Sequence, residues 1–222
     1  MSPKVHRYEG TALTVLYDPQ RCIHAAECVR GLPEVFDSAR RPWIAPDGAT
    51  ADRLAEVIRR CPSGALHYER RDGGAPEEPA AENVVTVVPD GPLEVRGRIE
   101  IASPDGTLFL RNSRATLCRC GASRNKPFCD RSHVEAGFRG PGVWPGNGAE
   151  AAAGEGDVLH VVCCQDGPLA CQGTFQLRDA SGHSTPLRRR ALCRCGGSAE
   201  KPFCDGSHAR IGFKTEEPAE PG

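Results

Sequence analysis

The chain lacks the long apolar segments and the one-sided charge that would place it at a membrane or on nucleic acid. Its 222 residues are 39% hydrophobic, and 28 Lys and Arg nearly balance 29 Asp and Glu, for a net charge of -1. No run approaches the roughly 18 apolar residues of a membrane-spanning helix, and no apolar signal-peptide core follows Met1. These absences argue against general attraction to nucleic acid or membranes and predict a soluble, cytoplasmic protein.

The sequence also lacks the signatures of catalysis. No pattern resembles a paired nucleophile and base, and no glycine-rich loop of the nucleotide-binding kind is present. We therefore expect that the protein is not an enzyme. What the chain does contain is cysteine, with 12 residues. In a reducing compartment, cysteines in such numbers are typical of metal ligands rather than of disulfides.

Six of these cysteines belong to a motif that occurs twice. Residues 118–133 read CRCGASRNKPFCDRSH and residues 193–208 read CRCGGSAEKPFCDGSH, so every Cys and His recurs 75 positions later. Each copy offers three thiolates and one imidazole, which are donors that zinc and iron–sulfur clusters accept. The candidate ligands are Cys118, Cys120, Cys129 and His133 in the first copy and Cys193, Cys195, Cys204 and His208 in the second.

The spacing within each copy divides the donors into two pairs. The two cysteines of C-x-C lie on the same face of an extended segment. A Cys and a His four residues apart lie on the same face of a helical turn. Two facing pairs suit a cluster with two irons. A single zinc ion held by three Cys and one His uses the same donors and is the alternative.

This motif resembles that of the CDGSH iron–sulfur family, of which mitoNEET is the best-known member. The likeness extends from Val84 to Phe213 and implies a two-iron, two-sulfide (2Fe-2S) cluster in each copy. The C-x-C pair would bind one iron, and the later Cys and His the other. The second copy spells Cys-Asp-Gly-Ser-His in full, whereas the first has Arg131 where Gly is usual. If this position requires a positive φ, Arg131 is strained.

A further group of cysteines precedes the repeat. Bacterial ferredoxins hold a cubane cluster with C-x2-C-x2-C and a remote Cys-Pro. This chain has Cys22 and Cys28 at the outer positions, Ala25 at the middle one, and Cys61 before a proline. The segment resembles divergent single-cluster ferredoxins, which implies a cluster held by these three cysteines. With three thiolates we expect a 3Fe-4S cluster, and a 4Fe-4S cluster with an exogenous ligand or His24 is the alternative.

Hydrophobic patterning predicts a small α+β, ferredoxin-like fold for this first part of the chain. Leu54, Val57 and Ile58 recur at helical spacing, which predicts a helix before Cys61. We also expect strands at 13–17 and 65–69, a short helix after Cys28, and a hairpin formed by residues 35–36 and 43–44.

The internal repeat extends beyond the ligand motif. The sequence Asp-Gly-Pro-Leu at 90–93 returns at 166–169, a displacement of 76. This displacement aligns Cys163, Cys164 and Cys171 with three valines, so we expect buried strand positions, and a redox pair is the alternative. CDGSH proteins with one motif form twofold dimers around a shared β-sandwich. Two motifs in one chain therefore predict an intramolecular pseudo-twofold sandwich and a monomeric protein.

These observations divide the chain into three folded parts. Residues 1–71 form a divergent ferredoxin-like domain, and residues 84–139 and 158–213 form the two CDGSH units. The segments 72–83 and 140–157 are rich in small residues and are expected to be linkers, and 214–222 is expected to be a disordered tail.

Three cluster sites of two types predict one-electron transfer between a redox protein that donates electrons and one that accepts them. The alternative is cluster storage or delivery, or redox and pH sensing, in which His133 and His208 release labile clusters. Imidazole binds metal only when it is unprotonated, and this makes acid a natural trigger for release.

Overall fold

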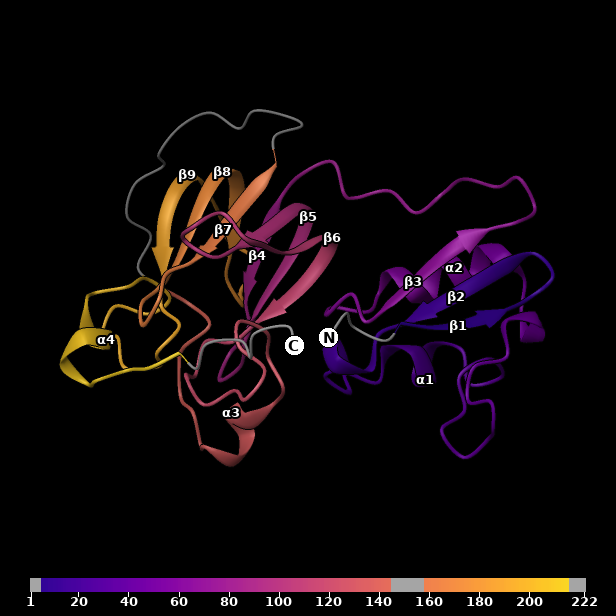
Figure 1. The fold of residues 1–222 in the computed structure, drawn as a ribbon, viewed down its shortest axis with the longest axis horizontal. Helices are drawn as coiled ribbons and strands as arrows, with labels where there is room; N and C mark the ends of the chain where they lie inside the picture. The colour runs from indigo at the N-terminus through magenta and orange to yellow at the C-terminus, as the bar shows by residue number, and fades with distance from the viewer. Residues whose placement is uncertain (1–4, 145–157, 216–222) are drawn as a thin grey trace. The chain divides into compact units, whose positions relative to one another are not determined.

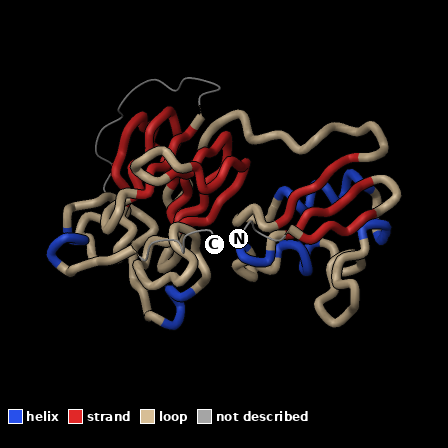
Figure 2. The backbone as a smooth tube through the Cα atoms, in the orientation of Figure 1, coloured by secondary structure: helices blue, strands red, loops and turns tan. Residues whose placement is uncertain are grey.

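The computed structural model describes residues 5–144 and 158–215, which belong to two compact units divided after Glu78 (Figure 1). Strands dominate the second unit, whereas the first combines three strands with short helices (Figure 2), in agreement with the predicted mixed α and β class. Among the described helices, none has the length and apolar character needed to cross a membrane.

The first unit is a three-stranded antiparallel sheet in the order β1-β2-β3. Buried residues of the longest helix, among them Leu54 and Ile58, share one apolar core with Leu13 and Val15 of the central strand. The strands are β1 (His6–Glu9), β2 (Leu13–Tyr17) and β3 (Leu66–Arg70), and the helices are η1 (Pro19–Arg21), α1 (Glu27–Gly31), η2 (Pro46–Gly48) and α2 (Ala51–Arg59).

Most predicted elements of this unit form, with small differences in their bounds. The short helix begins one residue before Cys28 rather than after it, and the strand β1 has no counterpart in the prediction. The predicted hairpin forms as a minimal antiparallel pair, because Phe36 and Ile44 form an isolated bridge. Ala45 N–H donates to the Val35 carbonyl at 3.0 Å and Asp37 N–H to the Trp43 carbonyl at 2.8 Å, and the pairing does not extend into longer strands.

The described residues of the second unit form six strands, three from each half of the repeat. Each half places its strands antiparallel to their sequence neighbours and ends in a single helical turn. The first half contains β4 (Val84–Val87), β5 (Leu93–Ala102), β6 (Leu108–Leu117) and α3 (Ser132–Glu135), and the second half contains β7 (Leu159–Cys163), β8 (Leu169–Arg178), β9 (Ser184–Leu192) and α4 (Ser207–Arg210).

The short first strand of each half also pairs with the long strand of the other half. β4 lies parallel to β8, with Val84 opposite Gln176, and β7 lies parallel to β5, with His160 opposite Glu100. These two pairings coincide when the residue numbers are displaced by 76. The buried residues of both halves form one apolar core. Each half therefore completes the sheet of the other.

Two of the unassigned cysteines lie in this core. Cys163 ends β7 and Cys171 lies in β8, where both are buried among aliphatic side chains. Cys164 follows β7 and is half-buried. The predicted buried strand position is confirmed for Cys163 and Cys171, which act here as small apolar side chains.

The ends of the predicted linkers pack against the second unit. The buried Asn83 amide donates to the Thr174 carbonyl at 3.0 Å. Trp144 lies edge-on to Phe203, with ring centroids 6.0 Å apart. Thr215 N donates to an Asp166 carboxylate oxygen at 2.7 Å. The predicted linker residues 145–157 and tail residues 216–222 lie outside the described residues.

The two motif loops meet at their C-x-C segments. Cys120 and Cys195 form an antiparallel backbone bridge. The following glycines have φ values of +82° at Gly121 and +78° at Gly196. A Cβ at Gly196 would lie 2.5 Å from the Cys120 carbonyl oxygen, and one at Gly121 would lie 2.6 Å from that of Cys195. Only glycine fits both the conformation and the approach.

Replacement of Gly196 by Ala should therefore destabilise the second unit by about 2–4 kcal/mol, because a left-handed residue is strained and its Cβ clashes with backbone. Gly182→Ala is a matched control, since Gly182 has φ +90° but nothing within 4 Å of its Cβ position. It should lose only about 1 kcal/mol. Urea unfolding measures both, and equal losses would contradict the close contact between the loops.

Candidate metal centres

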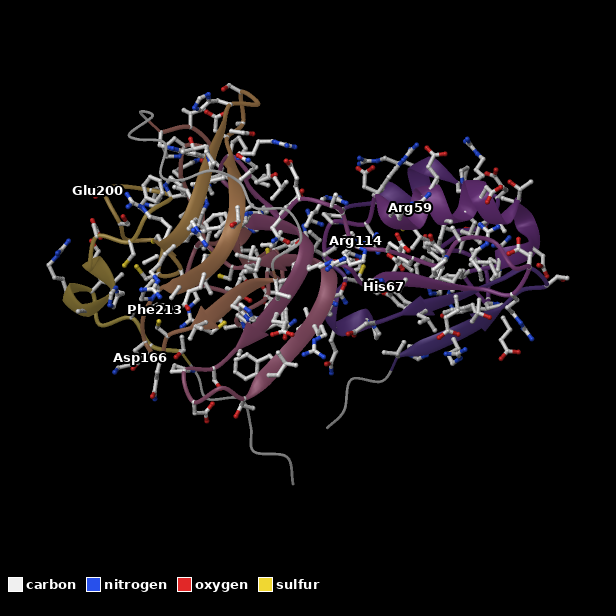
Figure 3. The ribbon with its side chains drawn as sticks, turned by 90° about the horizontal axis from the view of Figure 1, so that it is seen from above. Arg59, His67, Arg114, Asp166, Glu200 and Phe213 are labelled. Atoms are coloured by element: carbon white, nitrogen blue, oxygen red, sulfur yellow. The ribbon has the colours of Figure 1, made fainter. Side chains whose placement is uncertain are left out.

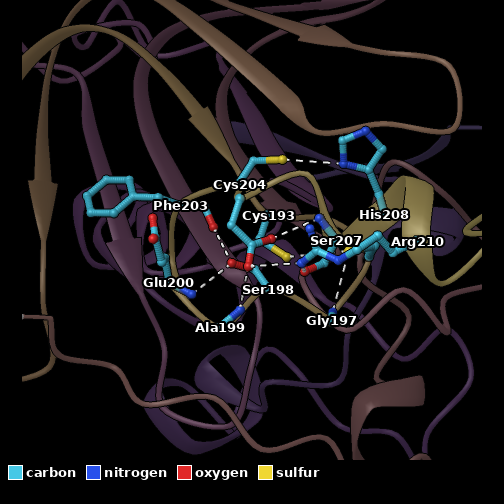
Figure 4. A network of polar contacts seen from close by, with 12 residues as sticks. Cys193, Gly197, Ser198, Ala199, Glu200, Phe203, Cys204, Ser207, His208 and Arg210 are labelled. Atoms are coloured by element: carbon cyan, nitrogen blue, oxygen red, sulfur yellow. Dashed lines mark hydrogen bonds and ion pairs between the residues drawn. The ribbon is translucent and has the colours of Figure 1, made fainter.

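Each copy of the repeated motif brings its four donors together as two close pairs. The pair distances in the first copy are 3.7 Å between Cys118 Sγ and Cys120 Sγ and 3.5 Å between Cys129 Sγ and His133 Nδ1. The same distances in the second copy are 3.8 Å for Cys193 and Cys195 and 3.4 Å for Cys204 and His208. Figure 4 shows the second copy, with the Cys204 sulfur facing the His208 ring.

Backbone pairing places the two pairs of each copy next to one another. Strand β6 runs into Cys118, whose N–H donates to the Pro127 carbonyl at 2.9 Å, and Cys129 N–H donates back to Thr116 at 2.9 Å. The second copy repeats these bonds at Cys193 and Cys204. The antiparallel exchange brings the third cysteine beside the C-x-C segment. The first and third cysteines of each copy, which are 11 residues apart in the sequence, therefore lie in neighbouring backbone segments of the same loop.

The aspartate that follows the third cysteine of each copy accepts hydrogen bonds from two backbone N–H groups of the same loop. Asp130 accepts from Ser132 N at 2.9 Å and from Arg124 N at 2.8 Å. Asp205 accepts from Ser207 N and Ala199 N in the same way. A carboxylate therefore satisfies donors at the start of the helical turn that carries His133 or His208.

Some contacts around the ligand cysteines lower the pKa of a thiol and favour the thiolate, whereas burial raises the pKa and opposes it. Backbone N–H groups of Ala122, Gly197 and Arg131 point at ligand sulfurs at 3.3 to 3.4 Å. A hydrogen bond from Cys120 is the main cause that lowers the pKa of Cys118 to about 6. Burial raises the pKa of Cys129 to about 11. A bound cation would supply the charge that the buried thiolates require.

The arrangement of the donor pairs bears on which metal group each copy could hold. Among the residues that the structure describes, no three His, Cys, Asp or Glu side chains converge on a position for a single metal ion. The donors of each copy instead form two pairs, and each pair is close enough to share one metal. Each pair could thus bind one metal of a two-metal cluster, and the same pair distances also allow a single zinc ion bound by four donors at about 2.0–2.3 Å.

The position at which the first copy departs from Cys-Asp-Gly-Ser-His requires a positive φ. Arg131 has φ +74°, and the equivalent Gly206 has φ +82°. A Cβ at Gly206 would meet nothing within 4 Å, so the left-handed conformation alone disfavours a side chain there. The predicted strain at Arg131 is thus present and amounts to about 1 kcal/mol.

The three cysteines of the first unit line one cavity of about 490 Å³. This volume is in the range of cofactor sites. Burial and the neighbouring Cys61 thiol raise the pKa of Cys28 to about 11. Burial, together with the charge of Cys22 and a hydrogen bond to it, raises the pKa of Tyr17. The structure therefore gathers cysteines from three different segments in one apolar pocket.

Ala25 and His24 both line this cavity. His24 is exposed, and it and Ala26 have positive φ values of 51° and 65° on either side of Ala25. His24 and Glu27 also line the cavity and are of types that can bind iron. Tyr17 and Trp43 also line the cavity, and nothing in the ligand pattern pointed to them.

Comparisons with known proteins agree with the two kinds of site. Residues 8–71 match the family described as a divergent 4Fe-4S mono-cluster, and residues 90–134 and 166–209 match the iron-binding zinc finger of CDGSH type. Over 64 residues, 29% of this chain, the chain is 39% identical to the uncharacterized protein YjdI of Escherichia coli K12, and the match covers 84% of that protein. YjdI of Escherichia coli O157:H7 gives the same values. No solved structure matches.

Substitutions at Arg131 and at the equivalent Gly206 should change the stability of the second unit in opposite directions. Arg131→Gly should stabilise the second unit by about 0.5–1 kcal/mol, because glycine adopts the left-handed conformation without strain. Gly206→Ala should destabilise it by about 1 kcal/mol for the same reason. Denaturant unfolding of both variants gives the two values. A loss of stability in Arg131→Gly would show that the arginine side chain contributes more than its backbone conformation costs.

Proposed function

Because the chain belongs to the CDGSH iron-binding family and also carries a divergent 4Fe-4S mono-cluster domain, we propose that this iron–sulfur protein mediates one-electron transfer. The single observation that carries the proposal is the presence of two kinds of donor set in one chain. In the second unit, the residues that would hold the clusters are Cys118, Cys120, Cys129 and His133 in one copy and Cys193, Cys195, Cys204 and His208 in the other.

Clusters bound there would supply reversible one-electron chemistry. The residues of the chain shield the sulfurs from water, donate N–H groups to them and restrict the movement of the loops. A neutral imidazole in place of one thiolate makes each donor set less negative, which favours reduction, as in Rieske centres. We propose redox proteins as donor and acceptor, with the two kinds of site at different potentials.

The exchanged strands support an internal counterpart of the family's twofold dimer. β4 and β7 each complete the sheet of the other half in the same register. A single copy would leave these strand edges open to another chain. We infer a pseudo-twofold sandwich made within one polypeptide, and a monomer in solution in the cytoplasm.

The cluster of the first unit is better described with four irons than with three. The matching family is described by a 4Fe-4S cluster, which gives no support to the expected preference for 3Fe-4S. We propose a four-iron cluster held by Cys22, Cys28 and Cys61. One iron would lack a cysteine ligand, because Ala25 occupies the position of the missing one.

Iron and sulfide analysis of anaerobically purified protein should give about eight irons per chain. In air, loss of the iron without a cysteine ligand should produce a three-iron electron paramagnetic resonance signal. Ala25→Cys should abolish this signal by supplying a fourth thiolate, and Ala25→Ser is the size-matched control. About seven irons in the anaerobic protein, with a three-iron signal from the start, would instead support a native 3Fe-4S cluster.

A second function is cluster delivery, favoured by the unequal exposure of the donors. His133 and His208 are half-buried, whereas Cys118 and Cys193 are each 1% exposed. The imidazole side of each site is therefore the side from which a cluster could leave.

Incubation of the loaded protein with an iron-free ferredoxin separates the two functions. Electron transfer predicts reversible bleaching and recovery of the visible spectrum with no loss of iron from this chain. Delivery predicts that iron appears in the acceptor ferredoxin, at a rate that depends on His133 and His208. Transfer of most of the iron without reversible reduction would reject the electron-transfer proposal.

A further inference from the structure

Three consecutive arginines of β9, Arg188, Arg189 and Arg190, lie just before the second motif loop, and we call them the arginine patch. All three side chains are exposed, although buried residues flank them in the same strand. Among the described strands β9 pairs only with β8, so it forms an edge of the sheet (Figure 1). Successive residues of a strand point to opposite faces. The patch therefore brings positive charge to both sides of an open edge.

The positive charge of the patch is not paired within the part of the chain that the structure describes. None of the ion pairs there includes an arginine of the patch. The long strands of the second half, β8 and β9, carry four arginines and no acidic residue. The corresponding strands β5 and β6 carry four arginines and two glutamates, and Glu100 accepts from Arg111 at 2.6 Å. The excess of positive charge is thus a property of the second half.

The first half has no equivalent of the patch. With the displacement of 75 that relates the motif copies, the three arginines correspond to Ser113, Arg114 and Ala115. Arg114 is 4% exposed and Ala115 is fully buried. Figure 3 shows Arg114 and Glu200 of the second motif loop on opposite sides of the second unit. A partner attracted by the patch would therefore approach the second copy of the motif and not the first.

Contacts at the end of the patch connect it to the second motif loop. The Arg190 guanidinium lies 4.6 Å from the centre of the Phe203 ring, and the Trp144 ring meets the same ring edge-on. The next residue, Ala191, accepts a hydrogen bond from the N–H of Cys204 at 3.0 Å. Phe203 is half-buried. The patch thus adjoins an aromatic side chain and a backbone segment that holds a candidate ligand, and arginines and aromatic residues are enriched in protein interfaces.

The acidic residues of the same loop do not reverse the sign of this surface. Glu200 is exposed, and its carbonyl accepts from Phe203 N at 2.9 Å. Lys201 follows it directly in the sequence. Asp205 lies 3.8 Å from the Arg210 guanidinium. Lys201 and Arg210 balance these two carboxylates, so the charges of the arginine patch remain in excess.

We propose that the arginine patch is the docking surface for an acidic redox protein that exchanges single electrons with the second CDGSH site. The inference rests on the proposed function and specifies the chemistry of one partner. Complementary charge steers two proteins together and fixes their orientation. The whole chain has a net charge of -1, whereas domains that bind nucleic acid are typically basic. A protein with a local acidic surface is therefore the occupant that fits the patch.

The test uses the loaded full chain and a reduced, strongly acidic flavodoxin as the probe partner. Each transfer removes one electron from the flavin and adds one electron to this chain, and stopped-flow absorbance follows the flavin. In the double variant Arg188→Gln with Arg189→Gln, the second-order rate constant at low ionic strength should fall about tenfold. Its dependence on salt should also weaken, because fewer charges remain to be screened.

Two further variants control for net charge and for the presence of a side chain. Arg53→Glu lowers the net charge by the same amount as the double variant, at an exposed position of α2, and should keep the parent rate. Arg188→Lys with Arg189→Lys keeps both charges and should also keep it. A parent rate in the glutamine variant would overturn the proposal. An equal decrease in Arg53→Glu would overturn it as well, because net charge and not the patch would then be responsible.

Two other roles of the patch predict different results, and either result would overturn the proposal. Charged residues on an edge strand can prevent association with other chains. Self-association of the glutamine variant in sedimentation, together with the parent rate, would assign this protective role. Binding of single-stranded RNA but not of the flavodoxin, lost in the glutamine variant, would assign a nucleic acid as the partner.

Reduction by dithionite separates this inference from the proposed function. A parent protein that holds no iron, or that dithionite does not reduce reversibly, would reject the proposed function itself. A parent protein that is reduced reversibly, with a glutamine variant that reacts with the flavodoxin at the parent rate, would reject only the docking surface.

Discussion

The parallel pairing of each short strand with the long strand of the other half is the contact on which the second unit depends. β4 beside β8 and β7 beside β5 enclose one apolar core, so neither half has a complete core of its own. The motif loops leave the ends of β6 and β9, and this pairing directs both loops to the same end of the unit. The bridge between Cys120 and Cys195 follows from that arrangement.

The repetition of the motif makes the differences between the two copies informative. Arg131 and Gly206 have almost the same φ, so the turn is imposed by the loop and not by the residue. The N–H of Arg131 points at the Cys129 sulfur at 3.3 Å, and a relaxed backbone would lose that bond. The strained backbone at Arg131 therefore keeps its N–H directed at the Cys129 sulfur.

In the first unit the candidate ligands come from segments that are remote in the sequence, whereas each copy in the second unit holds its ligands in one motif. Cys22 follows η1, Cys28 lies in α1 and Cys61 follows α2, and the packing of α2 on the sheet brings the third cysteine to the first two. The loop around Ala25 keeps two positive φ values although one cysteine of the ferredoxin pattern is absent. The pocket is thus built by the fold and does not require all four ligands.

The sequence by itself determined the donor types, their pairing by spacing, and the repeat. Local spacing decides these features, since residues two or four apart share a face in a strand or a helical turn. It also placed Cys163 and Cys171 on strands and identified Arg131 as the exceptional residue. The ligand roles and cluster types are still predictions, and the three-iron preference received no support.

Only the tertiary structure decided which strands pair between the halves and what surrounds Arg119 and Arg194. The carbonyls that hold Arg119 belong to turns at Val88 and Gly140, far from it in sequence, and no local pattern records such partners. The predicted hairpin near Trp43 is present only as one bridge with its two flanking backbone bonds, and its short extent was likewise decided by the fold. The Arg40 side chain donates to the carbonyls of Val35 and Pro42 in this loop, and hydrophobic alternation does not reveal such contacts.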